Sequence, residues 1–467
     1  MSFQRDLAWQ NIEADYQSSV AHKMARYALK LQYDMMPKDV VHQAKRILLD
    51  TLGCAIGALD AQARSMCEET VLELGGTPEA TLFGSGIRTN ALNATLYNSF
   101  LVRYLDYNDL GGGGHNSDAI PSILAVAERE KSKGQDFLTS LVISYEIGQR
   151  FADAANVSAL WERGWCFDIR GGLSMPPSLG KLMGMTEEQI ANAIGVCASQ
   201  SNPLNVLDAH EEECVHAKNL RFGIVSYNAL LSCMLARKGF TGPVRVIEGD
   251  SGVAQAILMG DINYERLLDF SGWRILKTRF KVLCTNGTNS GTVLATLGLV
   301  EEHDLKPEDI ESVKISAIPR QAEHTTTPAK KYPRNAESAD HSTFYASAFA
   351  IKHRHFGPES TKPEYFTDPV ILDLIERITV VGDPSLSGYQ AISEITTKNG
   401  KKLVKRIDTP HGLGNDPLSD KELEEKFKDM AAKYMDEKQI CKIIDTIWNA
   451  DKLDNMGKLA ELMVLPK

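Results

Sequence analysis

The hydrophobic pattern changes twice along the chain, and this change is the feature that most constrains the fold. From about residue 15 to 265 apolar residues recur at helical spacing, and from about 270 to 410 they alternate as in half-buried strands. A helical pattern returns after Ser419. We therefore predict a mainly α protein with an α+β second domain. Residues 1–268 and 413–467 would form an all-helical domain, and residues 269–412 a smaller α+β domain.

Local signals support this division. Thr186-Glu-Glu-Gln189 and Ser419-Asp-Lys-Glu422 are capping boxes that open helices. Further helices are predicted after Pro37, over 118–131 with Gly134 as a stop, and over 218–237. In the second region, 275–283 and 313–317 alternate like strands, 288–303 and 341–353 read as helices, and Asn399-Gly400 predicts a hairpin between 391–397 and 402–407.

Composition excludes several classes of function. The net charge is −10, with 61 acidic and 51 basic residues, which argues against nucleic-acid and anionic-membrane binding. No run approaches the roughly 18 apolar residues of a membrane span. The eight cysteines never form a C-x-x-C pair, so we expect small buried thiols rather than disulfides or a metal cluster. With no readable signal peptide, we expect a cytoplasmic protein.

The segment from Leu105 to Asp118 is the strongest candidate site. A predicted helix runs into Asp106, then a run of glycines that ends at Gly114, then His115 and a new helix near Ser117. Glycines allow close approach of a ligand, a helix N-terminus favours an anion, and histidine exchanges protons near neutral pH. The alternative is a flexible loop in which Ser117 is an N-cap.

Other polar clusters leave two interpretations open. Alternation would place Lys277, Arg279 and Lys281 on one side of a strand, either as anion-binding groups or as a basic solvent-facing edge. His341 either contacts a substrate or is hydrogen-bonded locally, with Asp340 or Ser342 as a helix cap. The segment from His210 to His216 carries ligand-type residues but completes no tetrahedral metal set.

The order of three motifs resembles that of the MmgE/PrpD family, over nearly the whole chain. The family includes 2-methylcitrate dehydratase, cis-aconitate decarboxylase and an iminodisuccinate epimerase. The matching residues are Leu105-Asp-Tyr-Asn-Asp with His115-Asn-Ser-Asp118, Ala236-Arg-Lys-Gly-Phe-Thr-Gly-Pro243, and Ala339-Asp-His-Ser342 with Tyr345. The resemblance implies a helical domain with an α+β lid over a cleft, a homodimer, small polycarboxylate substrates, and no metal or organic cofactor.

The resemblance also implies site residues. Asp106 and His115 match family active-site positions, and Lys218 and Lys277 fall where the decarboxylase branch has lysines. We take these four as candidate catalytic residues. As candidate substrate-binding residues we add Gly114, Ser117, Arg279, His341 and Tyr345. Acid and base roles fall to His115 and Asp106, without a choice between them.

The chain departs from the family pattern at several positions. Leu110 stands in place of a threonine and Asn116 in place of a proline. Histidines expected near Trp165-Cys166-Phe167 and at Asn286 are missing, as is the decarboxylase tyrosine near Ala322. These losses count against cis-aconitate decarboxylation. We therefore expect a hydro-lyase that acts on a 2-methylcitrate-like hydroxy-polycarboxylate. The alternatives are a dicarboxylate epimerase or isomerase, a decarboxylase, or a catalytically weak polycarboxylate-binding protein.

Overall fold

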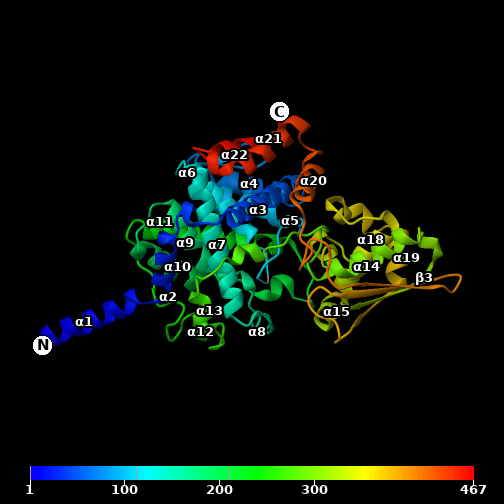
Figure 1. Cartoon of the computed structure of the whole chain (residues 1–467), viewed down its shortest axis with the longest axis horizontal. Coiled ribbons are helices and arrows are strands. Elements are labelled where there is room, and N and C mark those ends of the chain that lie inside the picture. Colours follow the sequence, from blue (N-terminus) through cyan, green and yellow to red (C-terminus); the bar gives the residue numbers. More distant parts are fainter. Residues whose placement is uncertain (1, 113, 210, 467) are drawn as a thin grey trace.

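Two separate hydrophobic cores organise the chain (Figure 1). The structure, a computed structural model, describes residues 2–112, 114–209 and 211–466, with side chains from residue 10 onward. The first core draws buried residues from Val20 to Cys284 and from Leu418 to Met463, and we call this the helical part. The second core draws from Leu283 to Leu403, and we call this the mixed part. The domain borders at 268/269 and 412/413 stay predictions.

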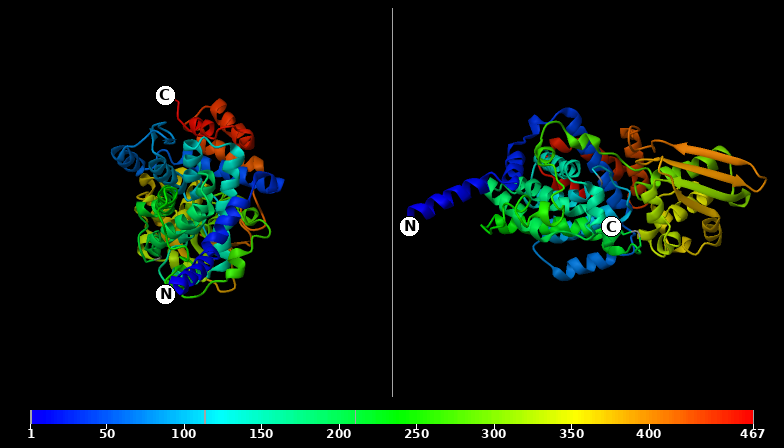
Figure 2. Two further views of the ribbon diagram at one scale, coloured as in Figure 1. Left: turned by 90° about the vertical axis from the view of Figure 1, so that its left-hand side faces the viewer. Right: turned by 90° about the horizontal axis from the view of Figure 1, so that it is seen from below.

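The last three helices of the chain belong to the helical part again, because they pack on helices from the first third of the chain (Figure 1). The N-terminal helix projects away from the body (Figures 1 and 2). A two-residue pair of antiparallel strands, β1 (Ala80–Thr81) and β2 (Arg88–Thr89), completes this part. Its helices are α1 (Ser2–Gln17), α2 (Val20–Lys30), α3 (Lys38–Gly57), α4 (Arg64–Leu74), α5 (Ala91–Tyr104), α6 (Ile120–Arg129), α7 (Gly134–Ala154), α8 (Val157–Glu162), α9 (Gly171–Leu182), α10 (Glu187–Gln200), α11 (Arg221–Ala236), α12 (Val253–Ala256), α13 (Tyr264–Leu268), α20 (Asp420–Ala431), α21 (Glu437–Trp448) and α22 (Gly457–Leu462).

The mixed part is a four-stranded sheet covered by helices (Figure 2). The strand order is β4–β3–β5–β6, with β3 parallel to β4 and the other pairs antiparallel. Helix α14 packs on β5 and β6, and buried residues alternate along β5. The elements are α14 (Asn289–Glu302), β3 (Ile310–Ala317), α15 (Pro319–Thr325), α16 (Pro328–Lys331), α17 (Ala336–Ala339), α18 (Thr343–His353), α19 (Pro369–Arg377), β4 (Ile378–Gly382), β5 (Ala391–Thr397) and β6 (Lys402–Ile407).

The predicted fold class is confirmed, and most local signals are too. Both capping boxes open helices, α10 and α20, and the Asn399-Gly400 turn joins β5 to β6. The helix expected over 118–131 begins as a 3-10 turn and ends at Arg129, while Gly134 starts α7 instead of stopping a helix. All eight cysteines are free, and six of them are buried as expected, whereas Cys67 is half-buried and Cys441 is exposed. None of the helices in the described residues has the length and apolar character that crossing a bilayer requires.

The strand predicted over 275–283 is wrong. Residues Arg274–Lys277 form a 3-10 helix, and backbone N–H groups in this helix and beyond it donate to several different segments. The N–H of Ile275 donates to Glu146, and that of Phe280 to the carbonyl of Gly412. Because no single neighbouring strand offers a ladder of partners, the alternation of apolar residues does not produce a strand here.

A buried lysine connects the C-terminal helices to the rest of the molecule. Lys426, on α20, is 7% exposed and donates from Nζ to Asp50 Oδ1 on α3 (2.7 Å). The same ammonium donates to the carbonyls of Tyr107 (2.8 Å) and Lys281 (2.9 Å) and lies over the Tyr107 ring. One side chain therefore holds three segments that are distant in the sequence.

Replacing this lysine should destabilise the fold. Lys426→Met leaves the buried Asp50 carboxylate without its partner, and we expect a loss of about 3–5 kcal/mol in the free energy of unfolding. Adding Asp50→Asn should recover part of the loss, because the uncompensated charge is removed. Lys428→Met, at an exposed position of the same helix, is the matched control. Denaturant unfolding measures all four proteins, and equal stability of the Lys426 and Lys428 variants would contradict this reading.

Candidate active site

A buried carboxylate, that of Asp106, is the centre of the candidate site. The residue follows the C-cap of α5 and has a φ of 44°, in the left-handed region where glycine or asparagine usually ends a helix. Its N–H donates to the carbonyl of Arg103, and its side chain is 2% exposed. The left-handed conformation is unfavourable for aspartate by about 1 kcal/mol. Glycine would end the helix without this cost, so the presence of aspartate indicates that its carboxylate has a role of its own.

Four cationic or imidazole groups surround this carboxylate. The distances to its oxygens are 2.6 Å from Lys281 Nζ, 2.9 Å from Arg103 Nη1, 3.1 Å from His115 Nε2 and 3.4 Å from Lys218 Nζ. They arrive from α5, from the glycine loop, from the 3-10 helix His216–Leu220 and from the chain beyond Arg274–Lys277. We call this set the Asp106 cluster.

The electrostatic balance of the cluster fixes the state of its members. Burial by itself would raise the pKa of Asp106, but the charges of Arg103, Lys281 and Lys218 hold it well below its usual value. Asp106 therefore stays ionised at neutral pH and has no proton to give. Burial lowers the pKa of Lys281 despite its contact with Asp106. For Lys218, the carboxylates of Asp340 and Asp106 outweigh burial, and the pKa is raised.

His115 is neutral in this environment. Burial first, and then the charges of Arg103 and Lys281, lower its pKa well below the ordinary value of histidine. Its Nε2 faces Asp106, which favours the tautomer with the proton on Nε2. Its Nδ1 has no hydrogen-bond partner in the part of the chain that the structure describes. The imidazole therefore presents a lone pair that can accept a proton.

A second carboxylate, from the mixed part, joins the cluster through Lys218. Asp340 Oδ2 lies 2.9 Å from Lys218 Nζ, and Asp340 Oδ1 contacts His341 Nδ1. His341 Nε2 lies 3.1 Å from Asp208 Oδ1 and 3.7 Å from Asp106 Oδ2. The site is thus shared between both parts of the molecule, and Lys218 connects their carboxylates.

A cavity of about 370 Å³ opens onto this arrangement. Asp106, His115 and His341 line it together with apolar, polar and charged side chains from both parts. Those further residues include Arg103, Leu110, Trp161, Phe167, Asp208, Arg221, Asn286, Arg320, Gln321 and His324. A larger cavity of about 540 Å³ is lined by Tyr107, Val282 and Lys426. We assign the site to the smaller cavity, because the perturbed titratable groups converge there.

The structure brings five of the nine predicted site residues together. Asp106, His115 and Lys218 belong to the Asp106 cluster, and His341 and Gly114 line the cavity. A side chain at Gly114 would meet the Arg170 guanidinium at 2.6 Å, and Arg170 donates to the carbonyl of His115 (2.9 Å). Gly114 therefore leaves space for the arginine that holds the histidine loop. Gly113 and His210 lie outside the described residues.

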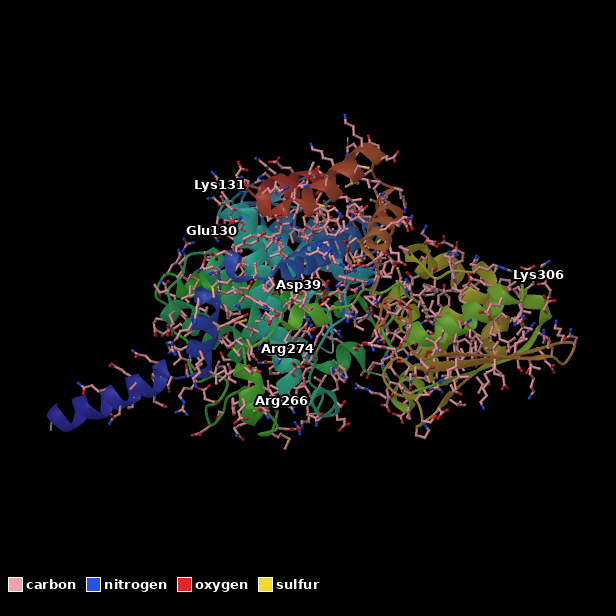
Figure 3. The ribbon with its side chains drawn as sticks, in the orientation of Figure 1. Asp39, Glu130, Lys131, Arg266, Arg274 and Lys306 are labelled. Atoms are coloured by element: carbon pink, nitrogen blue, oxygen red, sulfur yellow. The ribbon has the colours of Figure 1, made fainter. Side chains whose placement is uncertain are left out.

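Lys277 lies outside the cluster. Its side chain is 64% exposed and its Nζ is 3.7 Å from Asp153 on α7. Arg274, on the same short helix and labelled in Figure 3, also binds Asp153 (2.7 Å). The position predicted for Lys277 is taken by Lys281, which is fully buried. The error follows from the wrong strand over 275–283, which placed both lysines on one face.

The other three predicted residues have structural contacts instead. Ser117 donates to Asp109 through its N–H (3.2 Å) and its hydroxyl. Arg279 donates to the backbone carbonyls of Gly414, Leu276 and Thr278. Tyr345 is buried in the second core, and its hydroxyl donates to the carbonyl of Ser360 (2.6 Å). None of the three lines the 370 Å³ cavity.

Sequence reasoning missed Arg103, Asp208, Arg221 and the pairing role of Asp340. Arg103 interrupts an apolar helical stretch, so a charged residue at a position expected to be buried was the available signal there. Asp340 was considered only as a helix cap. Asp208 lies at the end of a short 3-10 helix and Arg221 at the start of α11, and no local sequence pattern indicates that both reach the cavity.

Comparison with known proteins identifies the family. Family models described as the MmgE/PrpD N-terminal domain and the MmgE/PrpD C-terminal domain match residues 22–265 and 290–450. The chain belongs to the MmgE/PrpD family. A cis-aconitate decarboxylase of Aspergillus terreus is 22% identical, covering 98% of each chain, and the human cis-aconitate decarboxylase is 22% identical, covering 96% of this chain and 95% of the relative. An alkylcitrate dehydratase of a fungal species is 24% identical, covering 93% and 91%.

Several departures from the family pattern of MmgE/PrpD proteins face the cavity. Leu110, Asn286, Cys166 and Phe167 all line it, whereas Ala322 does not. The cationic cluster is therefore combined with a cavity wall that differs from the one the resemblance implies.

A buried carboxyl group next to the cluster, that of Asp118, gives a test of the local electrostatics. Burial raises the pKa of Asp118 to about 7, above the roughly 3.9 of an unfolded chain. A raised folded-state pKa means that this contribution to stability is present at low pH and is lost as the pH rises through about 7. Asp118→Asn should therefore gain stability relative to the parent as the pH rises from about 5 to 7, by at most about 1.4 kcal/mol per pH unit, and the difference should level off between pH 7 and 8.

Unfolding curves at several pH values measure this difference. Asp34→Asn, at an exposed position, is the control and should show a constant offset from the parent protein. The same constant offset for Asp118→Asn would mean that Asp118 is ionised throughout this range.

Proposed function

We propose that this protein is a lyase that dehydrates a hydroxy-polycarboxylate similar to 2-methylcitrate. The observation that carries the proposal is the neutral imidazole of His115, whose Nδ1 is unpaired among the described residues, beside the Asp106 cluster. A base next to several fixed cations suits the removal of a proton from a carbon that bears a carboxylate.

The lining of the cavity supports a substrate with several carboxylates. Arg103, Arg221 and Arg320 reach it from both parts of the molecule, and guanidinium groups bind carboxylates in a bidentate manner. Trp161 and Phe167 provide apolar surface in the same cavity, where an alkyl substituent could pack. A volume of about 370 Å³ is in the range of small-molecule sites.

In the proposed reaction His115 moves one proton. Its Nδ1 takes the proton from the carbon next to a carboxylate, and the electron pair spreads onto the carboxylate oxygens. The cations of the Asp106 cluster stabilise this charge in a site with little water. The pair then forms the carbon–carbon double bond as the hydroxyl leaves the neighbouring carbon. Protonated His115 returns its proton to this hydroxyl, so that the products are an alkene and water.

In this scheme Asp106 is a positioning residue. Its low pKa excludes it as a proton donor at neutral pH. It holds the His115 tautomer through Nε2 and fixes the two lysines.

Decarboxylation is the second candidate, because the cis-aconitate decarboxylases match this chain over nearly its full length. Against it stand Asn286 and the Cys166–Phe167 segment, which line the cavity where the family resemblance leads us to expect histidines. Epimerisation would use the same proton step without loss of a hydroxyl.

Proton NMR in heavy water separates these reactions. The substrates are 2-methylcitrate, citrate and cis-aconitate, each with and without a chelator. We expect new alkene signals from 2-methylcitrate. Deuterium incorporation without a new product would favour epimerisation, and loss of carbon dioxide from cis-aconitate would favour decarboxylation. Silence with all three substrates would contradict the proposal.

Matched variants test the site on the substrate that is turned over. His115→Asn removes the base and should lower kcat by at least about 100-fold. Lys281→Met should lower kcat by about 100- to 1,000-fold, the usual loss when a group that stabilises developing charge is removed. Lys277→Met is the control and should retain parental kcat, because Lys277 is exposed. An equal effect of the two lysine variants would contradict the site assignment.

A further inference from the structure

Three residues from the two parts of the molecule form an apolar corner of the cavity. Leu110, from the loop that follows α5, lines the cavity together with Gly287 and Tyr389 of the mixed part. A Cβ atom at Gly287 would meet Leu110 Cδ2 at 2.8 Å and Tyr389 Cε1 at 3.6 Å. The leucine side chain and the tyrosine ring therefore come together over the bare backbone of the glycine. We call these three residues the apolar corner.

The backbone on both sides of the apolar corner is held in place. The N–H of Leu110 donates to the carbonyl of Arg279 (2.8 Å), and the N–H of Arg279 donates to the carbonyl of Leu110 (2.9 Å). On the other side, a Cβ atom at Gly291 of α14 would collide with the carbonyl oxygen of Tyr389. The segment before β5 thus lies directly against this helix, a close approach that glycine permits. The corner is therefore preformed, as small-molecule sites usually are.

The polar residues on either side of Gly287 are paired with each other. Asn286 Oδ1 accepts hydrogen bonds from the N–H of Thr288 (3.0 Å) and from its hydroxyl (2.7 Å). This oxygen therefore needs no polar partner on a ligand. An apolar group in the corner would leave both hydrogen bonds intact and would remove apolar surface from water.

A charged group of a ligand would be unfavourable in the same place. Leu110 and Gly287 have no side-chain hydrogen-bond donor. Burial raises the pKa of Tyr389 to about 12, and no cation among the described residues opposes this shift. A carboxylate in the corner would lose its hydration without gaining a cation, which is costly. The corner therefore favours an alkyl group over a further carboxylate.

The apolar corner lies beside the residues that carry the proposed chemistry. Leu110 follows Asp106 by four positions and precedes His115 by five, and all three residues line one cavity. A substrate whose carboxylates bind the cations near Asp106 therefore has the corner within the same cavity. The volume of about 370 Å³ is in the range that holds drug-sized ligands, which are larger than 2-methylcitrate. The cavity thus has room for a longer substituent than methyl.

We propose that the apolar corner binds an alkyl chain of the substrate, so that the protein prefers hydroxy-polycarboxylates whose alkyl substituent is longer than methyl. The inference rests on the proposed function for the class of compound, and it adds the residues that select among its members. Leu110, Gly287 and Tyr389 determine specificity in this scheme and take no part in proton transfer.

A homologous series of substrates tests the proposal. The series consists of citrate, 2-methylcitrate, and the analogues in which ethyl or butyl replaces the methyl group. We expect kcat/KM of the parent protein to rise by about 4- to 10-fold for each added methylene, the usual effect of burying such a group. The affinity measured by calorimetry should rise along the same series.

Variants of the corner should remove this preference. In Gly287→Ala the new Cβ pushes Leu110 into the corner, so that the gain from methyl to butyl should be lost while kcat/KM for 2-methylcitrate stays close to that of the parent. Leu110→Thr brings a hydroxyl into the corner and should reduce the preference in the same way. Leu74→Thr, at a position on α4 that is 64% exposed, is the matched control and should keep the parental preference.

The binding measurement separates this inference from the proposed function. Turnover of none of the four compounds, with affinities that still rise along the series, would contradict dehydration and support the apolar corner. Equal or falling affinity from methyl to butyl would overturn the inference, as would an equal effect of Gly287→Ala on both compounds. Absence of binding by all four compounds would overturn the inference and the proposed function together.

Discussion

The carboxylate of Asp106, buried among Arg103, Lys218, Lys281 and His115, is the interaction on which the rest of the site depends. Arg103, Lys218 and Lys281 would each be costly to bury alone, and the shared carboxylate makes their close packing possible. The same charges keep Asp106 ionised and His115 neutral. The same set of interactions therefore provides a base, His115, a carboxylate that orients it, and cations that can stabilise the negative charge developing on a substrate.

The two parts of the molecule contribute to this balance together. Lys218 of the helical part contacts Asp106 and also Asp340 of the mixed part (2.9 Å). Behind the cluster, Lys426 binds the carbonyls of Tyr107 and Lys281, which adjoin or belong to it. A change in how the helical and mixed parts pack would alter the surroundings of His115. Substitutions that weaken the contact between the parts should therefore also affect the chemistry in the cavity.

The sequence predicts the helices and the hairpin well, because capping boxes and the Asn399-Gly400 turn act locally. The unusual run of glycines also draws attention to Asp106 and His115, whose side chains the structure brings together, while their catalytic role stays a prediction. It fails for Lys281, because the choice between Lys277 and Lys281 depends on which of them is buried. Which lysine is buried depends in turn on the groups that bind the backbone of this segment. These are the Glu146 side chain and the Gly412 carbonyl, which lie far away in the sequence. Asp208 and Asp340 were likewise missed as a pair around His341, since only the packing of the two parts brings them together.

The most direct test of this account is the protonation state of His115. Nitrogen NMR of the histidine-labelled protein, with His115→Gln to assign the resonance, reports charge and tautomer from pH 5 to 8. The account predicts a neutral ring with its proton on Nε2 across this range, because burial and the neighbouring cations lower its pKa. An imidazolium at pH 7, or a proton on Nδ1, would contradict it, since the ring would then have no lone pair for the substrate.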